Sequence, residues 1–224
     1  MAVMLFDLNQ TLLDVRVLDP HFQRLFVRAE YRDRWLSQLL ELALTGVIAG
    51  EYRSFSELAD AALVMLAQRH GVPFAMSDRE RIAHELRRLP VQADVLAALE
   101  KLRQGGHRLA ALTNSPQELA DAQVAHSGLA PLLERVISSD RVRRHKPAVE
   151  PYQLAVTDMD ADPTTTWMVT AHAWDLAGAR AAGLRTAFVR RTGKELNPLA
   201  PPPDLVLEGL AELPRRFDPV VQPT

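Results

Sequence analysis

From about residue 91 onward, short apolar runs alternate with stretches of helical periodicity. The runs are too short for helices and are typical of buried strands; they occupy residues 108–113, 135–138, 167–170, 186–189 and 205–207. The helical stretches lie near residues 92–104, 116–128, 149–158, 173–182 and 209–215. This alternation predicts an α/β fold with a doubly wound, parallel, Rossmann-like sheet.

One further apolar run stands apart at the start of the chain, over residues 3–6, and ends at Asp7. Between it and residue 90, apolar residues recur at helical spacing, with a capping signal at residues 54–57 and a stop at residues 70–73. A further helix is expected to begin near Ser77. Such a long helical excursion predicts an inserted cap over the strand ends. We therefore predict an α/β hydrolase core of residues 1–15 and 90–224 and an all-helical cap of residues 16–89.

Composition narrows the partners of the chain. Its 224 residues are 47% hydrophobic and 24% charged, as in soluble globular proteins. Net charge is −2 without a long block of one sign, and no apolar stretch of about 18 residues or signal-peptide pattern occurs. We therefore expect a small-molecule substrate, no nucleic acid or membrane, and a cytoplasmic location. The absence of cysteine excludes disulfides, thiol nucleophiles and Cys-based zinc sites. The apolar residues 36–48 would suit either a cap core or a homodimer interface.

Polar motifs follow four of the expected strands. Because the carboxyl ends of parallel strands share one edge of a sheet, we expect these motifs to form one ligand site. Each motif alone has a simpler structural explanation, as a helix cap, a first helical turn or a charge in a basic loop. Their shared placement favours the site. The motifs are residues 7–11, Thr113-Asn114-Ser115, His145-Lys146-Pro147 and residues 170–175.

With these motifs, and with the run over residues 173–180 and Tyr152 after Lys146-Pro147, the sequence resembles the haloacid dehalogenase superfamily over nearly its whole length. Within that superfamily it is similar to the type II, or (S)-2-haloacid, dehalogenases. The resemblance implies that Asp7 is the nucleophile and Lys146 the third-motif lysine. It also implies that Thr113, with Asn114 beside it, forms the second motif and that Asp175 is the fourth-motif acid.

The chemistry of these residues agrees with that resemblance. A carboxylate such as Asp7 can form a covalent ester that water later hydrolyses. A nearby Lys146 would keep it ionised. Thr113, Asn114 and the N–H groups of the following helix would bind a substrate carboxylate. The remaining candidates for substrate binding are Asn9, Thr11 and Trp174.

Position 9 separates two chemistries. Phosphatases that resemble this superfamily carry an acid two residues after the nucleophile, which protonates the departing alkoxide, whereas Asn9 cannot give a proton. A halide leaves as a stable anion. The fourth motif also offers only Asp175, although the magnesium site of those phosphatases uses further carboxylates. Dehalogenation without metal or cofactor is therefore favoured, with a magnesium phosphatase and a non-catalytic binding relative as alternatives.

Three positions depart from the better-known dehalogenase pattern. Asn9 replaces a tyrosine, His172 replaces an asparagine, and Leu36 lies near the position of a cap arginine that would receive the halide; the alternatives for that arginine are Arg28, Arg32 and Arg34.

His172 resembles another branch, in which an imidazole, paired with a glutamate three residues after the nucleophile, activates water. Here that position is Gln10, which can orient but brings no charge. Gln10 is therefore either a natural variant with slower ester hydrolysis or an introduced change that traps the ester. Alternatively, His172 only caps a helix. His145 is expected to be exposed. Trp174, Trp35, Tyr52 and Phe55 are expected to pack in the core or cap, or to form an apolar wall around the carbon–halogen bond.

The resulting hypothesis is that Asp7 displaces halide from C2 of a short 2-haloalkanoate, possible substrates including fluoroacetate, with inversion. Water guided by His172 and Gln10 then releases the 2-hydroxy acid.

Overall fold

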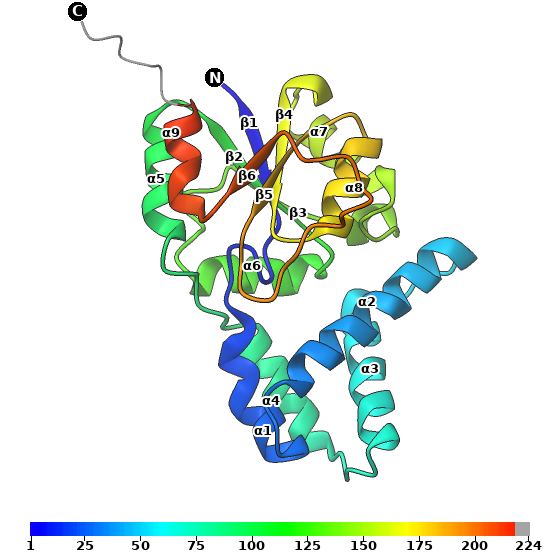
Figure 1. Cartoon of the computed structure of the whole chain (residues 1–224). Coiled ribbons are helices and arrows are strands. Elements are labelled where there is room, and N and C mark those ends of the chain that lie inside the picture. The colour runs from blue at the N-terminus through cyan, green and yellow to red at the C-terminus, as the bar shows by residue number, and fades with distance from the viewer. Residues whose placement is uncertain (218–224) are drawn as a thin grey trace, which may run out of the picture.

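The computed structural model describes residues 1–217 and contains a parallel six-stranded sheet in the order β3-β2-β1-β4-β5-β6 (Figure 1). The predicted doubly wound α/β sheet is confirmed, and each expected strand is present within one residue of its predicted bounds. Because β1 lies between β2 and β4, where the strand order reverses, Asp7 lies at the switch point at which such sheets bind ligands. The strands are β1 (Val3–Phe6), β2 (Arg108–Thr113), β3 (Arg135–Ser138), β4 (Thr166–Thr170), β5 (Arg185–Val189) and β6 (Leu205–Leu207).

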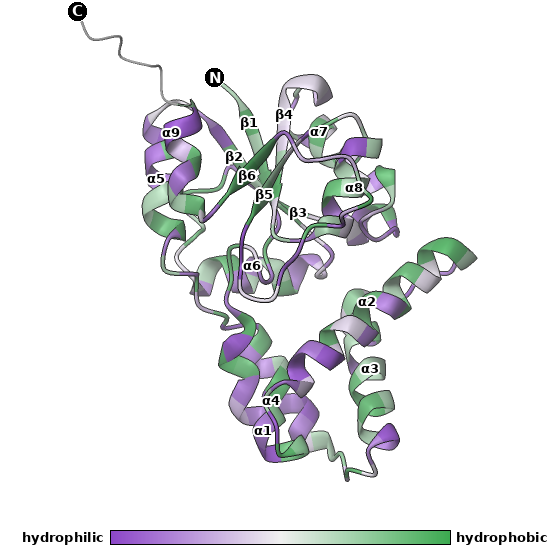
Figure 2. Ribbon diagram, in the orientation of Figure 1, coloured by the Kyte–Doolittle hydropathy of each residue, from purple (hydrophilic) through white to green (hydrophobic). Residues whose placement is uncertain are grey.

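Helices cover both faces of this sheet. Along β1, Met4 and Phe6 pack on the face that holds α5, α6 and α9, whereas Leu5 packs on the face that holds α7 and α8. Because helices cover both faces of the sheet, consecutive residues of a strand are all buried, and the strands are continuous apolar runs in the sequence. Figure 2 shows the apolar residues in green. The core helices are α5 (Val95–Gln104), α6 (Gln117–His126), α7 (Val149–Asp158), α8 (Ala173–Ala181) and α9 (Leu213–Phe217).

The expected helix at residues 209–215 is wrong in detail. A 3-10 turn, η4 (Leu210–Glu212), comes first, and α9 follows it with Pro214 in its first turn, where proline is tolerated. The remaining 3-10 turns are η1 (Val15–Leu18), η2 (Ser139–Val142) and η3 (Pro163–Thr165).

Four helices are inserted between β1 and α5, as the sequence indicated, and Figure 1 shows them beside the sheet's carboxyl edge. They are α1 (Asp19–Phe26), α2 (Tyr31–Ala49), α3 (Phe55–Arg69) and α4 (Met76–Leu86). A capping box joins Ser54 and Glu57 at the start of α3. Inside the bundle, the buried indole of Trp35 donates to the Ala59 carbonyl at 2.9 Å. The exact limits of the cap at residues 16 and 89 remain a prediction.

The inserted helices touch the core at two places. Near the exit of the insertion, Gln123 Nε2 donates to the carbonyl of Leu86 at the end of α4, at 2.8 Å, and Arg87 pairs with Glu118 at 2.9 Å. At the far end of α2, a ring nitrogen of His145 lies 2.9 Å from the Arg53 carbonyl oxygen. The cap is thus anchored at both ends.

The expectation that His145 is exposed was wrong. Its ring is 3% exposed and packs between Tyr52 and Phe55, with centroid distances of 5.2 and 5.6 Å. Burial lowers the pKa of His145 and favours its neutral form. The loop before Lys146 is therefore a docking point for the cap.

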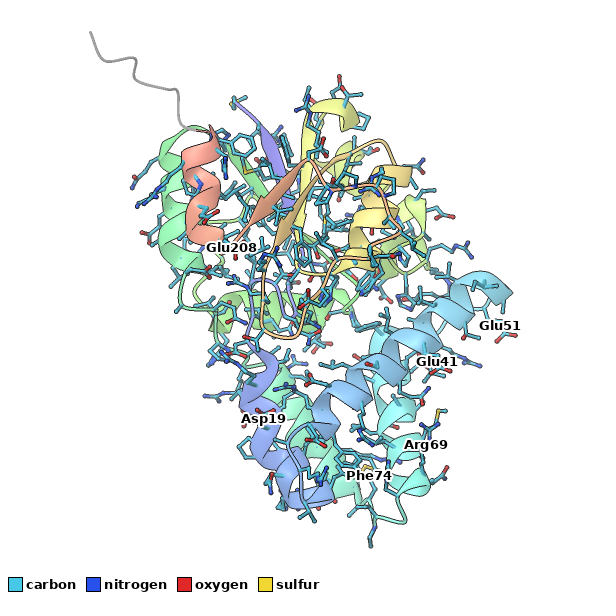
Figure 3. All side chains as sticks on the ribbon, in the orientation of Figure 1. Asp19, Glu41, Glu51, Arg69, Phe74 and Glu208 are labelled. Atoms are coloured by element: carbon cyan, nitrogen blue, oxygen red, sulfur yellow. The ribbon has the colours of Figure 1, made fainter. Side chains whose placement is uncertain are left out.

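Residues 36–48 lie within α2, where Leu39 and Ala43 are buried and Ile48 is exposed. Figure 3 labels Glu41 on this segment and Glu51 just after the end of α2. Among residues 1–217, no helix has the length and apolar character needed to cross a membrane.

Candidate active site

Asp7 directly follows β1, and its N–H continues the sheet ladder by donating to the Val169 carbonyl at 3.1 Å. Its carboxylate is almost fully buried and accepts two hydrogen bonds: Oδ1 from Lys146 Nζ at 2.9 Å and Oδ2 from Thr11 Oγ1 at 2.7 Å. Burial alone would raise the pKa of Asp7, but the positive charge of Lys146 and the nearby His172 lower it below its ordinary value. Asp7 is thereby kept ionised.

Lys146 is fully buried and uses all three ammonium protons. It donates to Asp7 Oδ1, to Asp175 Oδ2 and to the Leu112 carbonyl, each at 2.9 Å. Burial opposes the charged form, but the two carboxylates raise the pKa of Lys146 above its ordinary value. The alternative in which Lys146 is only one charge in a basic loop is wrong.

Asp175 completes the ion-pair cluster from the first turn of α8. Its Oδ1 accepts a 2.5 Å hydrogen bond from the Tyr152 hydroxyl, and burial raises the pKa of Asp175. Helix α8 can approach this closely because Gly178 has no side chain: a Cβ there would lie 2.5 Å from the Pro147 carbonyl oxygen and 2.6 Å from Tyr152 Oη. Gly178 therefore allows the close packing of α8 against the segment that carries Lys146 and Tyr152.

The second motif turns inward after β2. Thr113 Oγ1 accepts from the Ser115 N–H at 3.1 Å. The Asn114 amide binds the main chain of Lys146 in both directions, with Nδ2 donating to its carbonyl at 3.2 Å and Oδ1 accepting from its N–H at 2.8 Å. Asn114 thus positions the Lys146 loop, and its part in substrate binding stays a prediction. The simpler alternative for this motif, a side-chain helix cap, is wrong, because Pro116 is the N-cap residue of α6 and no side chain caps the helix.

His172 lies beside the nucleophile. Its Nε2 is 3.2 Å from the Asn9 carbonyl oxygen and 3.5 Å from Asp7 Oδ2, and its ring stacks on Trp174 at 5.1 Å. Two oxygen acceptors near Nε2 favour the tautomer with its proton there, which leaves Nδ1 as the basic nitrogen. Burial lowers the pKa of His172, although the charge of Asp7 opposes this shift. His172 is the N-cap residue of α8, as the helix-cap alternative has it, but its side chain makes no capping hydrogen bond.

Asn9 and Gln10 differ in their side-chain contacts. The Asn9 amide donates to Ser115 Oγ at 3.1 Å and accepts from Gln123 Nε2 at 3.2 Å. Gln10, held at a positive φ of 66°, faces the same cavity as His172. Within residues 1–217, its side chain makes no hydrogen bond, so no direct hydrogen bond joins Gln10 to His172.

A cavity of about 1150 Å³ separates the strand ends from the cap. Its floor contains the polar motifs, including Trp174, while its cap wall mixes apolar and charged side chains. Leu36 and Phe55 lie on that wall, and Trp35 lines the cavity from its buried position in the cap. Tyr52 does not line this cavity. Its hydroxyl donates to Asp140, which agrees with the expectation that it packs in the cap rather than around the substrate.

Of the three cap arginines expected near the halide, only Arg32 faces the cavity. Arg32 binds Asp19, labelled in Figure 3, at 2.5 Å and Asp33 at 3.0 Å. Arg28 instead pairs with Glu30, and Arg34 lies over the Tyr31 ring. The predicted halide receiver is therefore not a free arginine on the cap.

The acidic side chains of the site, which a metal ion would need as ligands, already accept hydrogen bonds. Asp7 and Asp175 both accept from Lys146, and the amide oxygen of Asn9 accepts from Gln123. Across the described part of the chain, no three His, Asp or Glu side chains are grouped in a way that could hold a metal ion.

Residues 1–183 match the model of the haloacid dehalogenase-like hydrolases. The chain belongs to this hydrolase family. It is 29% identical over 211 residues to (S)-2-haloacid dehalogenase 2 of Pseudomonas sp. (strain CBS-3), covering 93% of this chain and 92% of that protein. A solved dehalogenase structure with an intermediate complex is 26% identical, has a TM-score of 0.88 and covers 95% of each chain. The plasmid phosphoglycolate phosphatase of Cupriavidus necator is 36% identical over 126 residues, 56% of this chain and 54% of that protein.

Three further residues of this hydrolase surround the site, although the sequence analysis gave none of them a role there. Tyr152 binds Asp175, Gln123 binds Asn9, and Lys194 faces the cavity from the loop after β5. The spacing of Tyr152 from Lys146 was a usable signal for the first. The other two depend on contacts between distant segments.

Proposed function

We propose that this hydrolase is an (S)-2-haloacid dehalogenase that acts on short 2-haloalkanoates, with fluoroacetate among the candidate substrates. The observation that carries the proposal is the pairing of an ionised nucleophile with an amide where a phosphatase needs an acid. Lys146 holds Asp7 charged, while Ser115 and Gln123 hold the Asn9 amide. The names of its relatives support the same substrate class.

In the first step, an Asp7 oxygen attacks C2 of the haloacid from the side opposite the halogen. The new C–O bond forms as the carbon–halogen bond breaks, and the halide leaves with the bonding electrons. The product is an ester of Asp7 with inverted configuration at C2; the Asp7 carboxyl has lost its charge, and the substrate's own carboxylate keeps its charge. We propose that Thr113 and the N–H groups at the start of α6 bind the substrate carboxylate.

In the second step, water attacks the Cγ carbon of the ester and gives its proton to His172 Nδ1. The bond between Cγ and the ester oxygen breaks, so that the 2-hydroxy acid leaves and the Asp7 carboxylate returns. Esterification removes the negative charge that raised the pKa of His172, so the imidazole is neutral when it must accept the proton. Gln10 would orient the water without adding charge.

A magnesium-dependent phosphatase is the second candidate, because the phosphoglycolate phosphatase is the relative of higher identity, although over a shorter segment. The same Asp7 could attack phosphorus. The donor set fits this reaction poorly, since Asn9 cannot protonate an alkoxide and both acids of the cluster already bind Lys146.

The proposal extends to the reaction's requirements and to the organisation of the chain. We propose catalysis without a metal or cofactor, and a cap of residues 16–89 that covers the cavity. A cytoplasmic location and a homodimer through residues 36–48 also remain predictions.

One assay series separates the candidates. Halide release from 2-chloropropionate, 2-bromopropionate and fluoroacetate, and phosphate release from phosphoglycolate, are measured with chelator and with added magnesium. We expect halide release from at least one haloacid that is insensitive to chelator and absent in Asp7→Asn. Magnesium-dependent phosphate release without halide release would establish the phosphatase instead. Ligand binding without any turnover would indicate the non-catalytic relative.

A further inference from the structure

The cations that line the cavity are not equivalent. Among the described residues, seven of the eight lysine and arginine side chains on the cavity wall have an acidic partner within ion-pair distance. Lys194 is the exception: its ammonium makes neither a hydrogen bond nor an ion pair with any residue of the part of the chain described, 1–217. An unpaired cation on the wall of a cavity is available to a bound anion.

Lys194 lies within electrostatic range of the reacting groups without touching them. Its charge lowers the pKa of His172. In return, the charges of Asp33 and then Asp7 act to raise the pKa of Lys194, while Arg32 acts to lower it. Burial lowers the pKa of Lys194 itself, because a half-buried ammonium without a partner loses hydration. Binding an anion would restore part of what burial removes.

The loop that carries Lys194 is tied to the nucleophile. The Lys194 N–H donates to the Arg191 carbonyl at 3.0 Å, and the Arg191 guanidinium binds both carboxylate oxygens of Asp94 at 2.9 Å. The same guanidinium donates to the carbonyl of Thr11, whose hydroxyl holds Asp7. Lys194 therefore sits on an anchored turn that is connected to the Asp7 loop.

The charges at the strand ends explain why another cation is needed. Lys146 has no free proton, and its single positive charge faces the two carboxylates Asp7 and Asp175. During displacement, negative charge moves from Asp7 to the departing halide. Arg32 cannot supply a free charge for that halide, because it already binds Asp19 and Asp33.

We infer that Lys194 receives the departing halide, in place of an arginine from the cap. The inference rests on the proposed dehalogenase function and adds a leaving-group residue to it. The ammonium would stabilise the charge that develops on the halogen as the C2–halogen bond breaks, without forming a covalent bond or transferring a proton. Its contribution should therefore depend on which halogen leaves.

The test is single-turnover formation of the Asp7 ester, followed by rapid quench and mass spectrometry, with 2-chloropropionate and 2-bromopropionate. For Lys194→Met, we expect the rate to fall about 100-fold with the chloride and about 10-fold with the bromide, at nearly unchanged KM. Lys194→Arg should restore most of the rate. Arg190→Met is the matched control, because it removes a charge from the same loop that already pairs with Glu208, and it should leave both rates unchanged.

Product inhibition gives a second readout, because an inhibition constant does not depend on how fast each variant turns over. Added bromide should inhibit the wild-type enzyme and Arg190→Met alike, and should inhibit Lys194→Met about tenfold less strongly. If Lys194→Met slowed ester formation equally with both halogens, or only raised KM, the inference would be overturned and Lys194 would be assigned to the substrate carboxylate. If the wild-type enzyme releases no halide, the proposed function fails and this inference fails with it. An active wild type with an unimpaired Lys194→Met overturns the inference alone.

Discussion

The strand ends around Lys146 and the loop around Lys194 face one cavity, but their lysines are in opposite states. Lys146 is fully buried and its three protons are all taken by Asp7, Asp175 and Leu112. Lys194 is half-buried and has no acidic partner among residues 1–217. The comparison separates two uses of a positive charge. A fully paired lysine fixes the geometry of a nucleophile, whereas an unpaired one is free for an anion that arrives or forms during the reaction.

The largest effect should come from Lys146→Met. It leaves two buried carboxylates facing each other without their shared cation, and losing one partner of a buried ion pair costs about 3–5 kcal/mol. We expect the free energy of unfolding, measured by urea denaturation, to fall by about that amount and halide release to be lost.

Lys194→Met provides the contrast. Because no ion pair is broken, its free energy of unfolding should stay within about 0.5 kcal/mol of the wild-type value. Equal destabilisation by the two substitutions would contradict the distinction between a paired and an unpaired lysine.

The sequence predicts the sheet well because its strands are buried on both faces. Continuous apolar runs therefore mark β2 and β4 even without long-range information. Helix starts are less accessible to such reasoning. The start of α5 moves from residue 92 to Val95, after Asp94, whose carboxylate binds Arg191 from a segment 97 residues away.

For the site, the sequence predicts which residues reach the shared edge but not which of their polar groups are occupied. Asp7 and Asp175 could be placed because they follow strands at one edge. The engagement of the Asn9 amide depends on Gln123, 114 residues away, and the burial of His145 depends on Arg53 and the cap, 92 residues away. The unpaired state of Lys194 is likewise a property of the folded cavity.

The next largest effect concerns His172, which lies within electrostatic range of Lys194 and beside Asp7. Removing a general base typically slows its step by 10²–10⁴-fold, so His172→Ala should slow ester hydrolysis by about 100-fold or more. Ester formation should continue. Mass spectrometry of the quenched enzyme should then show the substrate's mass, less halide, on Asp7. A halide burst without this adduct would contradict the assignment.

A smaller effect, in this case faster ester hydrolysis, is expected from Gln10→Glu. Neutral His172 is the working form, so activity is lost as the pH falls through its pKa, which burial holds below its ordinary value. A carboxylate nearby favours the imidazolium and raises that pKa, so the acidic limb of kcat should move to higher pH by about one unit.

Above that limb, a better oriented and more basic imidazole should speed hydrolysis about tenfold. The double variant Gln10→Glu/His172→Ala should be no faster than His172→Ala. An unchanged pH profile would show that position 10 does not act through the imidazole.

The smallest effect tests an apolar position, Leu36, on the cap wall of the same cavity. Leu36 is half-buried and lines the cavity, so Leu36→Ala opens space for a longer substrate chain without changing any charge. Methylene discrimination in an apolar pocket is worth about 1–3 kcal/mol when the fit is tight. On a wide cavity wall we expect only about a threefold rise in kcat/KM for 2-chlorobutyrate relative to 2-chloropropionate.

Leu42→Ala is the control, because that side chain lies on the same helix and packs into the cap core. If both variants shift the ratio equally, cap stability rather than cavity shape determines chain length. If Leu36→Ala instead changes the chloride-to-bromide rate ratio, the halide lies against the cap and its assignment to the Lys194 loop is wrong.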